Sequence, residues 1–295
     1  MLVSPGALIS TDRGLLRGHG TYGEPDGSVR ASVLGAVTAV ARWVSVAPAR
    51  ARYTPEVGDI VVGRVREVAA RRWIVDVGAR CDAALPLAAL HLSGGDQRRR
   101  TIDDQLAMRA VLAEGDLLCA EVHSLGGDGG LTLHARSLQY GRLANGVLVR
   151  APPSAVPRQR AHVVALPPPL GVDVVMGVNG WVWLTGSLGL GSDAAAAGGD
   201  GLAIADELAE AIEARKAAAA EAPASPAQRR AVAALRAAVL FAAERGLPVT
   251  VDAIAAGAAA LLAAPEAEDS DAVLAAVWAG DGAALSAAAG ERGRR

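Results

Sequence analysis

Residues 55–78 read PEVGDIVVGRVREVAARRWIVDVG and contain two runs in which apolar residues alternate with polar ones. This alternation predicts a strand near 59–68, a turn, and a second strand near 72–77. The segment CDAALPL (81–87) predicts a third strand, and TIDDQLAMRAVL (101–112) predicts a helix. EGDLLCAEVHSL and GGLTLHARSL then predict two more strands around a glycine-rich turn. Five strands with a helix after the third are typical of a small barrel of the OB type.

The chain before this barrel has the pattern of a small β domain at residues 1–52. ALIS, SVRASVLGAVTAV and WVSVAP alternate apolar and polar residues between Gly and Pro, which predicts short strands joined by turns. The glycine-rich stretch RGLLRGHGTY (13–22) is expected to form a loop between them.

The chain after the barrel predicts an α+β domain over residues 140–254. Residues 193–224 are rich in Ala and Gly and predict a low-complexity insert with a helical centre. The next segment, SPAQRRAVAALRAAVLFAAERG, predicts a helix that Ser225 caps, that has Pro226 at its first position and that ends at Gly246. LPVTVDAI, which follows it, favours a strand.

The remaining residues, 255–295, are Ala-rich and predict a helical extension. The predicted fold class is therefore mixed β and α+β, and multidomain. Its predicted domains cover residues 1–52, 53–139 and 140–254, followed by the extension.

The charge of the chain is distributed unevenly. The net charge of the 295 residues is −2. Residues 1–160 hold 20 Lys and Arg against 15 Asp and Glu, which is +5, whereas residues 161–295 hold 9 against 16, which is −7. Nearly all the basic residues are Arg, whose planar guanidinium suits phosphate and stacks on bases. A genome rich in GC, which favours Arg and Ala codons, is an alternative explanation.

The cysteine count and the apolar runs exclude several protein classes. Cys81 and Cys119 are the two cysteines, too few for a disulfide scaffold or a multi-cysteine zinc site, and we expect both to be buried thiols in a reducing compartment. The N-terminus lacks the pattern of a signal peptide. The longest apolar stretch, near 253–264, is too short to span a bilayer. These features predict a soluble intracellular protein without a membrane partner.

The sequence contains no recognisable catalytic motif. Asp103 and Asp104 form a tight acidic pair, and their place at a predicted helix start favours interaction with the helix dipole over metal binding. The five histidines are scattered without metal-ligand spacing, and no Gly-rich loop ends in Gly-Lys-Ser/Thr. The sequence therefore predicts binding rather than catalysis, with no catalytic residue, metal or cofactor.

Two basic segments of the barrel are candidates for RNA binding. Arg71, Arg72 and Trp73 open a strand where barrels of this type expose phosphate-contacting and stacking side chains, although Trp73 could instead be a core residue. Arg98, Arg99 and Arg100 lie in a loop and could contact backbone phosphate, remain solvated or pair with a protein partner. His123, His134 and Arg136, on the last two strands, are weaker candidates.

Several segments together resemble the exosome cap subunits of the ribosomal RNA-processing protein four family. They cover most of residues 3–190 in the family's order, and a weaker match continues through 225–246. The matching segments are VSPGALISTDRGLLRGHGTY, YTPEVGDIVVGRVREVAARRW, GGDQRRRTIDDQLAMR, EGDLLCAEVHSL, LTLHARSLQYGRLANGVLV, PRQRAH and VVMGVNGWVWL.

The resemblance implies an N-terminal β domain, an S1 RNA-binding domain and a KH domain. It implies a subunit without nuclease activity that helps to hold a ring of six RNase PH-like proteins together and guides RNA into the ring's channel. The expected partners are single-stranded RNA, the ring subunits and other cap subunits, and the expected locations are nucleus, nucleolus and cytoplasm. The segment Arg17, Gly18, His19, Gly20, Thr21 and Tyr22 resembles the family's ring-docking module.

Three alternatives remain open at this point. A sister cap subunit would have the same domain plan, a ribonuclease could act alone, and a purely structural subunit would make no useful contact with RNA.

The motif Gly177, Val178, Asn179 and Gly180 marks the KH domain in this resemblance. A Gly-x-x-Gly loop can clamp a nucleic-acid backbone. Here strand-forming residues flank it on both sides and it contains no basic residue, so the sequence favours a hairpin turn. Asn-Gly predicts a type I′ turn, with positive φ at both central residues and Val178 opposite Trp181. We expect Trp181 and Trp183 to pack the domain against its neighbour.

Overall fold

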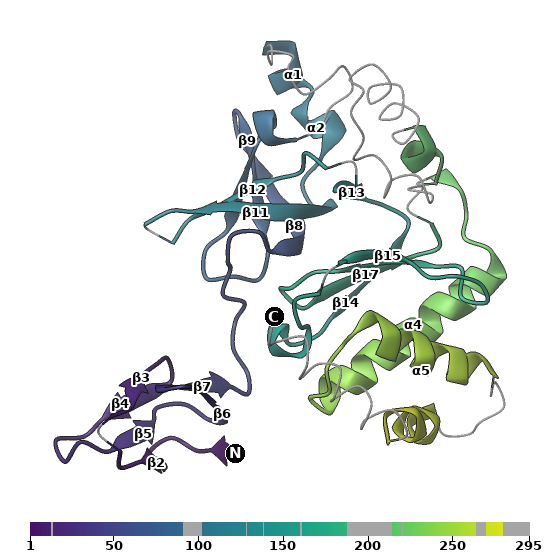
Figure 1. Ribbon diagram of the computed structural model, residues 1–295. Coiled ribbons are helices and arrows are strands. Elements are labelled where there is room, and N and C mark those ends of the chain that lie inside the picture. Colours follow the sequence, from purple (N-terminus) through teal and green to yellow (C-terminus); the bar gives the residue numbers. More distant parts are fainter. Residues whose placement is uncertain are drawn as a thin grey trace, which may run out of the picture. The chain divides into compact units, whose positions relative to one another are not determined.

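The computed structural model shows two compact units, residues 1–52 and 53–295 (Figure 1). They are the N-terminal unit and the C-terminal unit. The residues that the structure describes are 1–12, 14–90, 102–127, 129–137, 139–159, 161–187, 214–219, 221–263 and 270–279.

The N-terminal unit is a small β domain, as the sequence predicts. It contains two sheets, with strand orders β1-β6-β7-β3 and β2-β5-β4. Val3, Ala31 and Val46 form its small core. The strands are β1 (Leu2–Val3), β2 (Leu8–Ser10), β3 (Leu16–Arg17), β4 (Thr21–Gly23), β5 (Val29–Ala31), β6 (Gly35–Val40) and β7 (Trp43–Pro48).

The C-terminal unit begins with the five-stranded barrel that the sequence predicts. Its strands follow the order β12-β10-β9-β8-β11, and β12 also pairs with β11, which closes the barrel. A sixth strand, β13 (Gly141–Leu143), lies beyond the predicted end of this domain at residue 139 and pairs with β11. The barrel elements are β8 (Ile60–Val68), β9 (Arg72–Asp76), β10 (Ala83–Pro86), η1 (Leu87–Ala89), α1 (Ile102–Leu106), α2 (Met108–Val111), β11 (Leu117–Leu125) and β12 (Leu131–His134).

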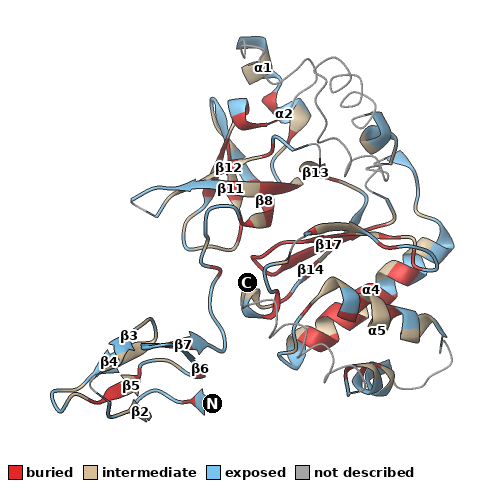
Figure 2. Ribbon diagram, in the orientation of Figure 1, coloured by how far each residue is buried: buried red, intermediate tan, exposed pale blue. Residues whose placement is uncertain are grey.

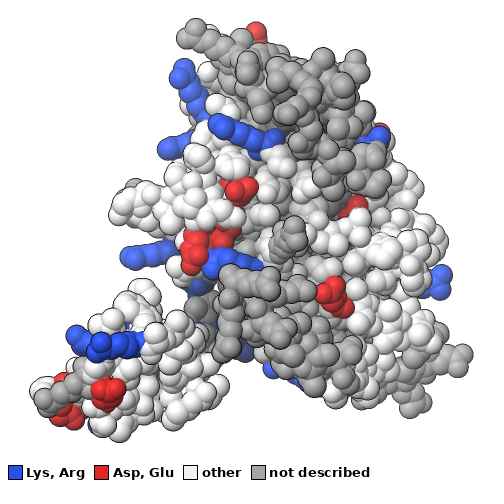
Figure 3. All heavy atoms as spheres, in the orientation of Figure 1, with Lys and Arg blue, Asp and Glu red and all other residues white. Residues whose placement is uncertain are grey.

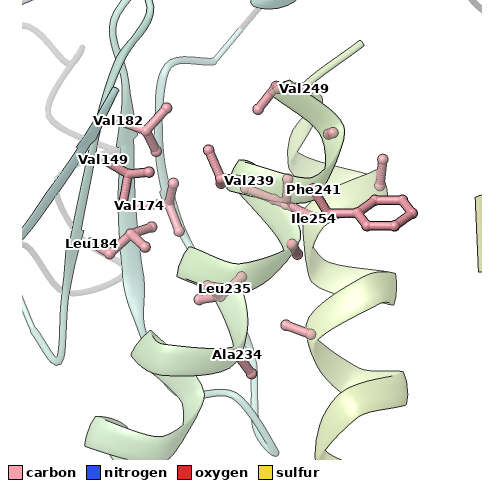
Figure 4. Close-up of a cluster of buried hydrophobic side chains, with 14 of the residues drawn as sticks. Val149, Val174, Val182, Leu184, Ala234, Leu235, Val239, Phe241, Val249 and Ile254 are labelled. Atoms are coloured by element: carbon pink, nitrogen blue, oxygen red, sulfur yellow. The ribbon is translucent and has the colours of Figure 1, made fainter. Parts of the chain in front are cut away.

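An α+β domain follows in the same unit. Its sheet has the order β14-β17-β16-β15, and α4 and α5 cover one face. In Figure 4, Val174, Val182 and Leu184 of the sheet point toward Leu235 and Val239 of α4. The elements are β14 (Gly146–Arg150), η2 (Pro153–Ala155), β15 (Val163–Ala165), β16 (Asp173–Met176), β17 (Trp181–Thr185), α4 (Pro226–Glu244) and α5 (Val251–Ala263).

The helix α4 begins as the sequence predicts. The Ser225 side chain accepts a hydrogen bond from the Gln228 backbone N–H, and the Gln228 side chain accepts one from the Ser225 N–H. This capping box pairs two backbone donors that would otherwise lack partners. The buried residues of the helix face the sheet or the helical segments that follow in the chain (Figure 2).

The prediction of a strand at 247–254 was wrong. Val251 begins α5, and the Thr250 hydroxyl accepts a hydrogen bond from the Ala253 N–H at the start of that helix. The β-branched residues that favoured a strand therefore lead into a helix start, where Thr is an effective cap. The predicted boundary between 254 and 255 falls inside α5. Leu274 and Trp278, from the segment predicted as an extension, join the domain's core.

Most of the predicted insert at 193–224 lies outside the described residues. Its described part includes a helical segment at 214–219. Lys216, the only lysine of the chain, lies there and donates a hydrogen bond from Nζ to the Tyr140 carbonyl at 2.8 Å.

The α+β sheet is covered on both faces at β17, which explains the unbroken apolar run of this strand. Every residue of WVWLT is buried. Val182 and Leu184 face the helices, whereas Trp181 and Trp183 face Val62 and Cys119 of the barrel. A strand that is covered on both faces is apolar at successive positions, because neither face meets water. The barrel and the helices thus sandwich this sheet.

Candidate nucleic-acid interface

The loop Gly177–Gly180 joins β16 and β17 as a hairpin, but its geometry differs from the predicted type I′ turn. Gly180 has a φ of 82°, whereas Asn179 does not have positive φ. The Gly180 N–H donates to the Gly177 carbonyl and the Gly177 N–H donates to the Trp181 carbonyl, each at 2.9 Å. A turn followed by one glycine at positive φ is a three-residue hairpin loop with a bulge.

This loop is packed against the barrel. The Asn179 amide Nδ2 donates to the carbonyls of Val62 and Val77, each at 2.8 Å, and the residue is 2% exposed. The Val178 N–H donates to the Ile60 carbonyl at 2.9 Å. The prediction that Val178 faces Trp181 was wrong, because Val178 packs into the barrel core and Gly177 stands opposite Trp181. The buried loop offers no open backbone to a nucleic acid.

The two tryptophans of β17 lie in the seam between barrel and sheet. Trp181 and Trp183 are 6% and 5% exposed and pack with Val62, Cys119 and Val175. The Arg150 guanidinium lies over the Trp181 ring, 4.4 Å from its centroid, where it makes a cation–π contact. Burial raises the pKa of Cys119 to about 12, so its thiol is protonated at neutral pH.

An ion pair between the exposed Arg158 and the buried Asp59 joins the start of the barrel to the α+β domain. Arg158 Nε lies 2.7 Å from Asp59 Oδ1 and Arg158 Nη2 lies 3.2 Å from Oδ2, while the Tyr53 hydroxyl donates to Oδ2 at 2.6 Å. Burial alone would raise the pKa of Asp59, but hydrogen bonds from Arg158, Tyr53 and the Glu56 N–H outweigh it, so the pKa is lowered. No local pattern in the sequence indicates this pair, whose members are 99 residues apart.

Trp73 is a core residue, and its prediction as an RNA-stacking side chain was wrong. It is 0% exposed, and its Nε1–H donates to the Leu112 carbonyl at 3.0 Å. Successive residues of a strand point to opposite faces, so Trp73 and Val75 fill the barrel while Ile74 points outward.

Arg71 and Arg72 are exposed at the tight turn between β8 and β9. The Ala69 N–H donates to the Arg72 carbonyl at 2.9 Å, and the Leu87 N–H donates to the Arg71 carbonyl at 3.0 Å, so the backbone of both is fixed. Within the described chain, neither guanidinium has an ion-pair partner.

Two other exposed arginines of the barrel are paired with carboxylates. Arg66 pairs with Asp82 at 2.8 Å and Arg109 with Glu114 at 3.0 Å. An arginine without a carboxylate partner keeps its donors for phosphate. Arg71 and Arg72 are therefore better placed to bind an anion than Arg66 or Arg109.

The predicted candidates Arg98, Arg99 and Arg100 lie outside the described residues. The segment that holds them follows Leu90, which forms a bridge with Ala135. Arg136, next to Ala135, is exposed.

Three neighbouring positions on one face of the barrel hold uncharged side chains. Ile74, Ala84 and Thr132 are half-buried and outward-facing, and they stand side by side on β9, β10 and β12. We call these three residues the open face. Arg72 lies two residues before Ile74 on the same strand, about 7 Å away by strand rise. Figure 3 shows basic side chains projecting from the end of this unit that carries α2, with uncharged surface between them.

The predicted docking segment lies in the N-terminal unit. Arg17, His19 and Tyr22 are exposed. Gly18 and Gly20 pass close to β7, where a Cβ on Gly18 would lie 2.9 Å from the Val44 carbonyl oxygen. The Thr21 hydroxyl donates to the Gly18 carbonyl at 2.8 Å. The two glycines therefore allow a close backbone approach, and three larger side chains remain at the surface.

The described ranges offer neither a metal centre nor a membrane-spanning helix. They contain no group of three His, Cys, Asp or Glu residues able to hold a metal ion. No helix found there is long and apolar enough to cross a membrane.

Three family models match the chain. A model described as the S1 domain of RRP4 matches residues 52–124, and one described as the exosome complex exonuclease RRP4 N-terminal region matches residues 2–40. A KH domain model matches residues 146–188.

Relatives with the same description come from fungi, mammals and archaea. Exosome complex component rrp4 of Schizosaccharomyces pombe is 47% identical over 62% of this chain and 55% of its own length. The Mus musculus component RRP4 is 49% identical over 62% of this chain and 61% of its own. The Thermococcus kodakarensis component Rrp4 is 30% identical over 63% of this chain and 71% of its own. The chain thus spans little more than half of the first two relatives.

Proposed function

Because the chain belongs to the Rrp4 family of exosome complex components, we propose that it is a non-catalytic, RNA-binding cap subunit of an RNA exosome. In this role it binds a ring of RNase PH-like proteins through the N-terminal unit, helps to hold that ring together and guides single-stranded RNA toward its channel. Other subunits carry out the 3′-to-5′ degradation in ribosomal RNA maturation and mRNA turnover.

The observation that carries the RNA-binding part is the open face with Arg71 and Arg72 beside it. The two guanidiniums have no carboxylate partner among the described residues, and the neighbouring Ile74, Ala84 and Thr132 bear no charge. An uncharged surface next to phosphate-binding arginines suits a single strand bound without sequence preference. The Gly177–Gly180 loop, by contrast, is buried against the barrel.

A charge-matched pair of double variants tests this assignment. R71A/R72A removes two charges beside the open face, and R230A/R236A removes two exposed arginines of α4. We expect R71A/R72A to weaken binding of single-stranded RNA about tenfold and to reduce the slope of log K against log salt by about 1.4, or 0.7 per phosphate contact. Fluorescence anisotropy of the full chain measures both. Equal losses of RNA affinity in the two double variants would show that binding depends on net charge and not on the position of Arg71 and Arg72.

The absence of catalysis is tested on the purified chain. We expect labelled single-stranded RNA to stay intact with the chain and Mg²⁺. Degradation that persists through further purification steps would make the chain a ribonuclease and contradict the proposal.

The assembly and the location need separate tests. We expect the tagged chain to co-purify with RNase PH-like proteins, and truncation of residues 1–52 to abolish that association. In cells we expect the tagged chain in the nucleus, the nucleolus and the cytoplasm by microscopy. Isolation of the chain without any such partner would argue against a cap subunit.

A further inference from the structure

We propose that His123, held in place by His134, is a base-stacking site on the barrel. This inference rests on the proposed binding of RNA and adds which side chain contacts a nucleobase. Single strands bind through stacking on aromatic or histidine rings as well as through phosphate contacts.

The burial of the other rings identifies His123. In the described part of the C-terminal unit, it is the one exposed aromatic or imidazole ring. His134 and Tyr140 are half-buried. The buried rings are Tyr53, Trp73, His162, Trp181, Trp183, Phe241 and Trp278.

A β-bulge turns His123 outward. The register between β11 and β12 shifts between Val122 and Ser124, so His123 is the extra residue. Val122 points into the barrel core and is 0% exposed, whereas His123 and Ser124 are both exposed. Bulges re-aim side chains and are common near binding sites.

Neighbouring side chains fix the orientation of the ring. The His123 and His134 rings make an edge contact, with centroids 5.3 Å apart and planes at 63°. His134 Nε2 lies 3.9 Å from Glu121 Oε1, and the Tyr140 hydroxyl donates to Glu121 Oε2 at 3.2 Å. A ring held in this way loses less conformational entropy when a base stacks on it.

The position of the ring connects it to the open face. Ser124, next to His123, stands opposite Thr132 on β12, and Thr132 stands beside Ala84 and then Ile74. Along the curved surface of the barrel, the path from Ser124 to Ile74 crosses three strand spacings, about 14 Å. A strand of RNA that places phosphates at Arg71 and Arg72 can cross this face and bring a base to His123.

Substitutions of His123 on the full chain test the proposal, with binding measured by anisotropy. The probes are a 12-nucleotide oligo(A) RNA and an abasic ribose-phosphate oligomer of equal length. We expect H123A and H123Q to weaken oligo(A) binding about fivefold or more and H123F to stay within about twofold of the wild type. On the abasic oligomer, H123A should bind like the wild type.

Each other outcome overturns the stacking site. Unchanged oligo(A) binding by H123A and H123Q would show that the ring makes no contact, and an equal loss on the abasic oligomer would show a backbone contact. If R71A/R72A weakens binding while the His123 variants do not, the stacking site is wrong and the proposed function stands. If the wild type binds neither probe, the stacking site and the proposed RNA binding are both wrong. Thermal unfolding shows that each variant is folded, and H123Q replaces H123A should the latter be unstable.

Discussion

At the scale of single residues, Asn179 shows that the Gly177–Gly180 loop forms a structural contact with the barrel. Its amide bonds two barrel carbonyls that no water can reach. We expect Asn179→Ala to lower the free energy of unfolding by about 2–4 kcal/mol, because both acceptors lose their partner. Asn179→Asp, which keeps the size but lacks the donors, should cost a similar amount. Chemical denaturation measures both. Weaker RNA binding at unchanged stability would instead make the loop an RNA clamp.

The buried carboxylate of Asp59 predicts a pH dependence. Its folded pKa lies below the ordinary value of about 3.9, so the stability that its ionised form contributes is present above that value and is lost as pH falls through the folded pKa. We expect the unfolding free energy of the wild type to decline more steeply below about pH 4 than that of Asp59→Asn. Urea unfolding from pH 7 to 3 measures the difference. Parallel pH profiles of the two proteins would mean that Asp59 contributes nothing to the pH dependence of stability.

At the scale of secondary structure, β17 is the element that binds the two halves of the C-terminal unit together. We expect Trp183→Ala to lower the free energy of unfolding by about 3 kcal/mol or more, since the ring fills the seam between sheet and barrel. Its RNA affinity should stay within about twofold of the wild type, because the seam is closed to solvent. Denaturation and anisotropy on the same preparation separate the two effects. A large loss of affinity with normal stability would place RNA at the seam.

The sequence predicts the strands of the barrel well, because apolar alternation survives in β8 and β9 and sets which side faces inward. The same alternation places Trp73 with Val75 in the core. The sequence pattern therefore already indicated that Trp73 is buried and does not stack on RNA. The start of α5 was missed because β-branched Val and Thr also favour strands, and only packing against α4 decides between the two structures.

The site is harder to predict than the fold. Arg66 and Arg72 look alike in the sequence, and only the cross-barrel position of Asp82 makes one paired and the other available. The contacts of Asn179 with Val62 and Val77, more than 100 residues away, depend on docking of the two domains. No local sequence pattern indicates the Arg66–Asp82 pair or the contacts of Asn179 with the barrel.

At the scale of the whole molecule, barrel and α+β domain should unfold together. They share the Asp59–Arg158 pair, the Asn179 contacts and the tryptophan seam. We therefore expect slow amides of β8 and β17 to exchange with the same opening free energy, and those of the N-terminal unit, with its small core, at a lower one. Hydrogen exchange by mass spectrometry measures this. Clearly different values for β8 and β17 would show that the two domains open independently.

Crosslinking locates the bound RNA most directly. Ultraviolet crosslinking of the full chain to single-stranded RNA, followed by peptide mass spectrometry, should place crosslinks in residues 71–86 and 121–136, on and beside the open face. Crosslinks concentrated in residues 177–180, with none on the barrel strands, would contradict the account.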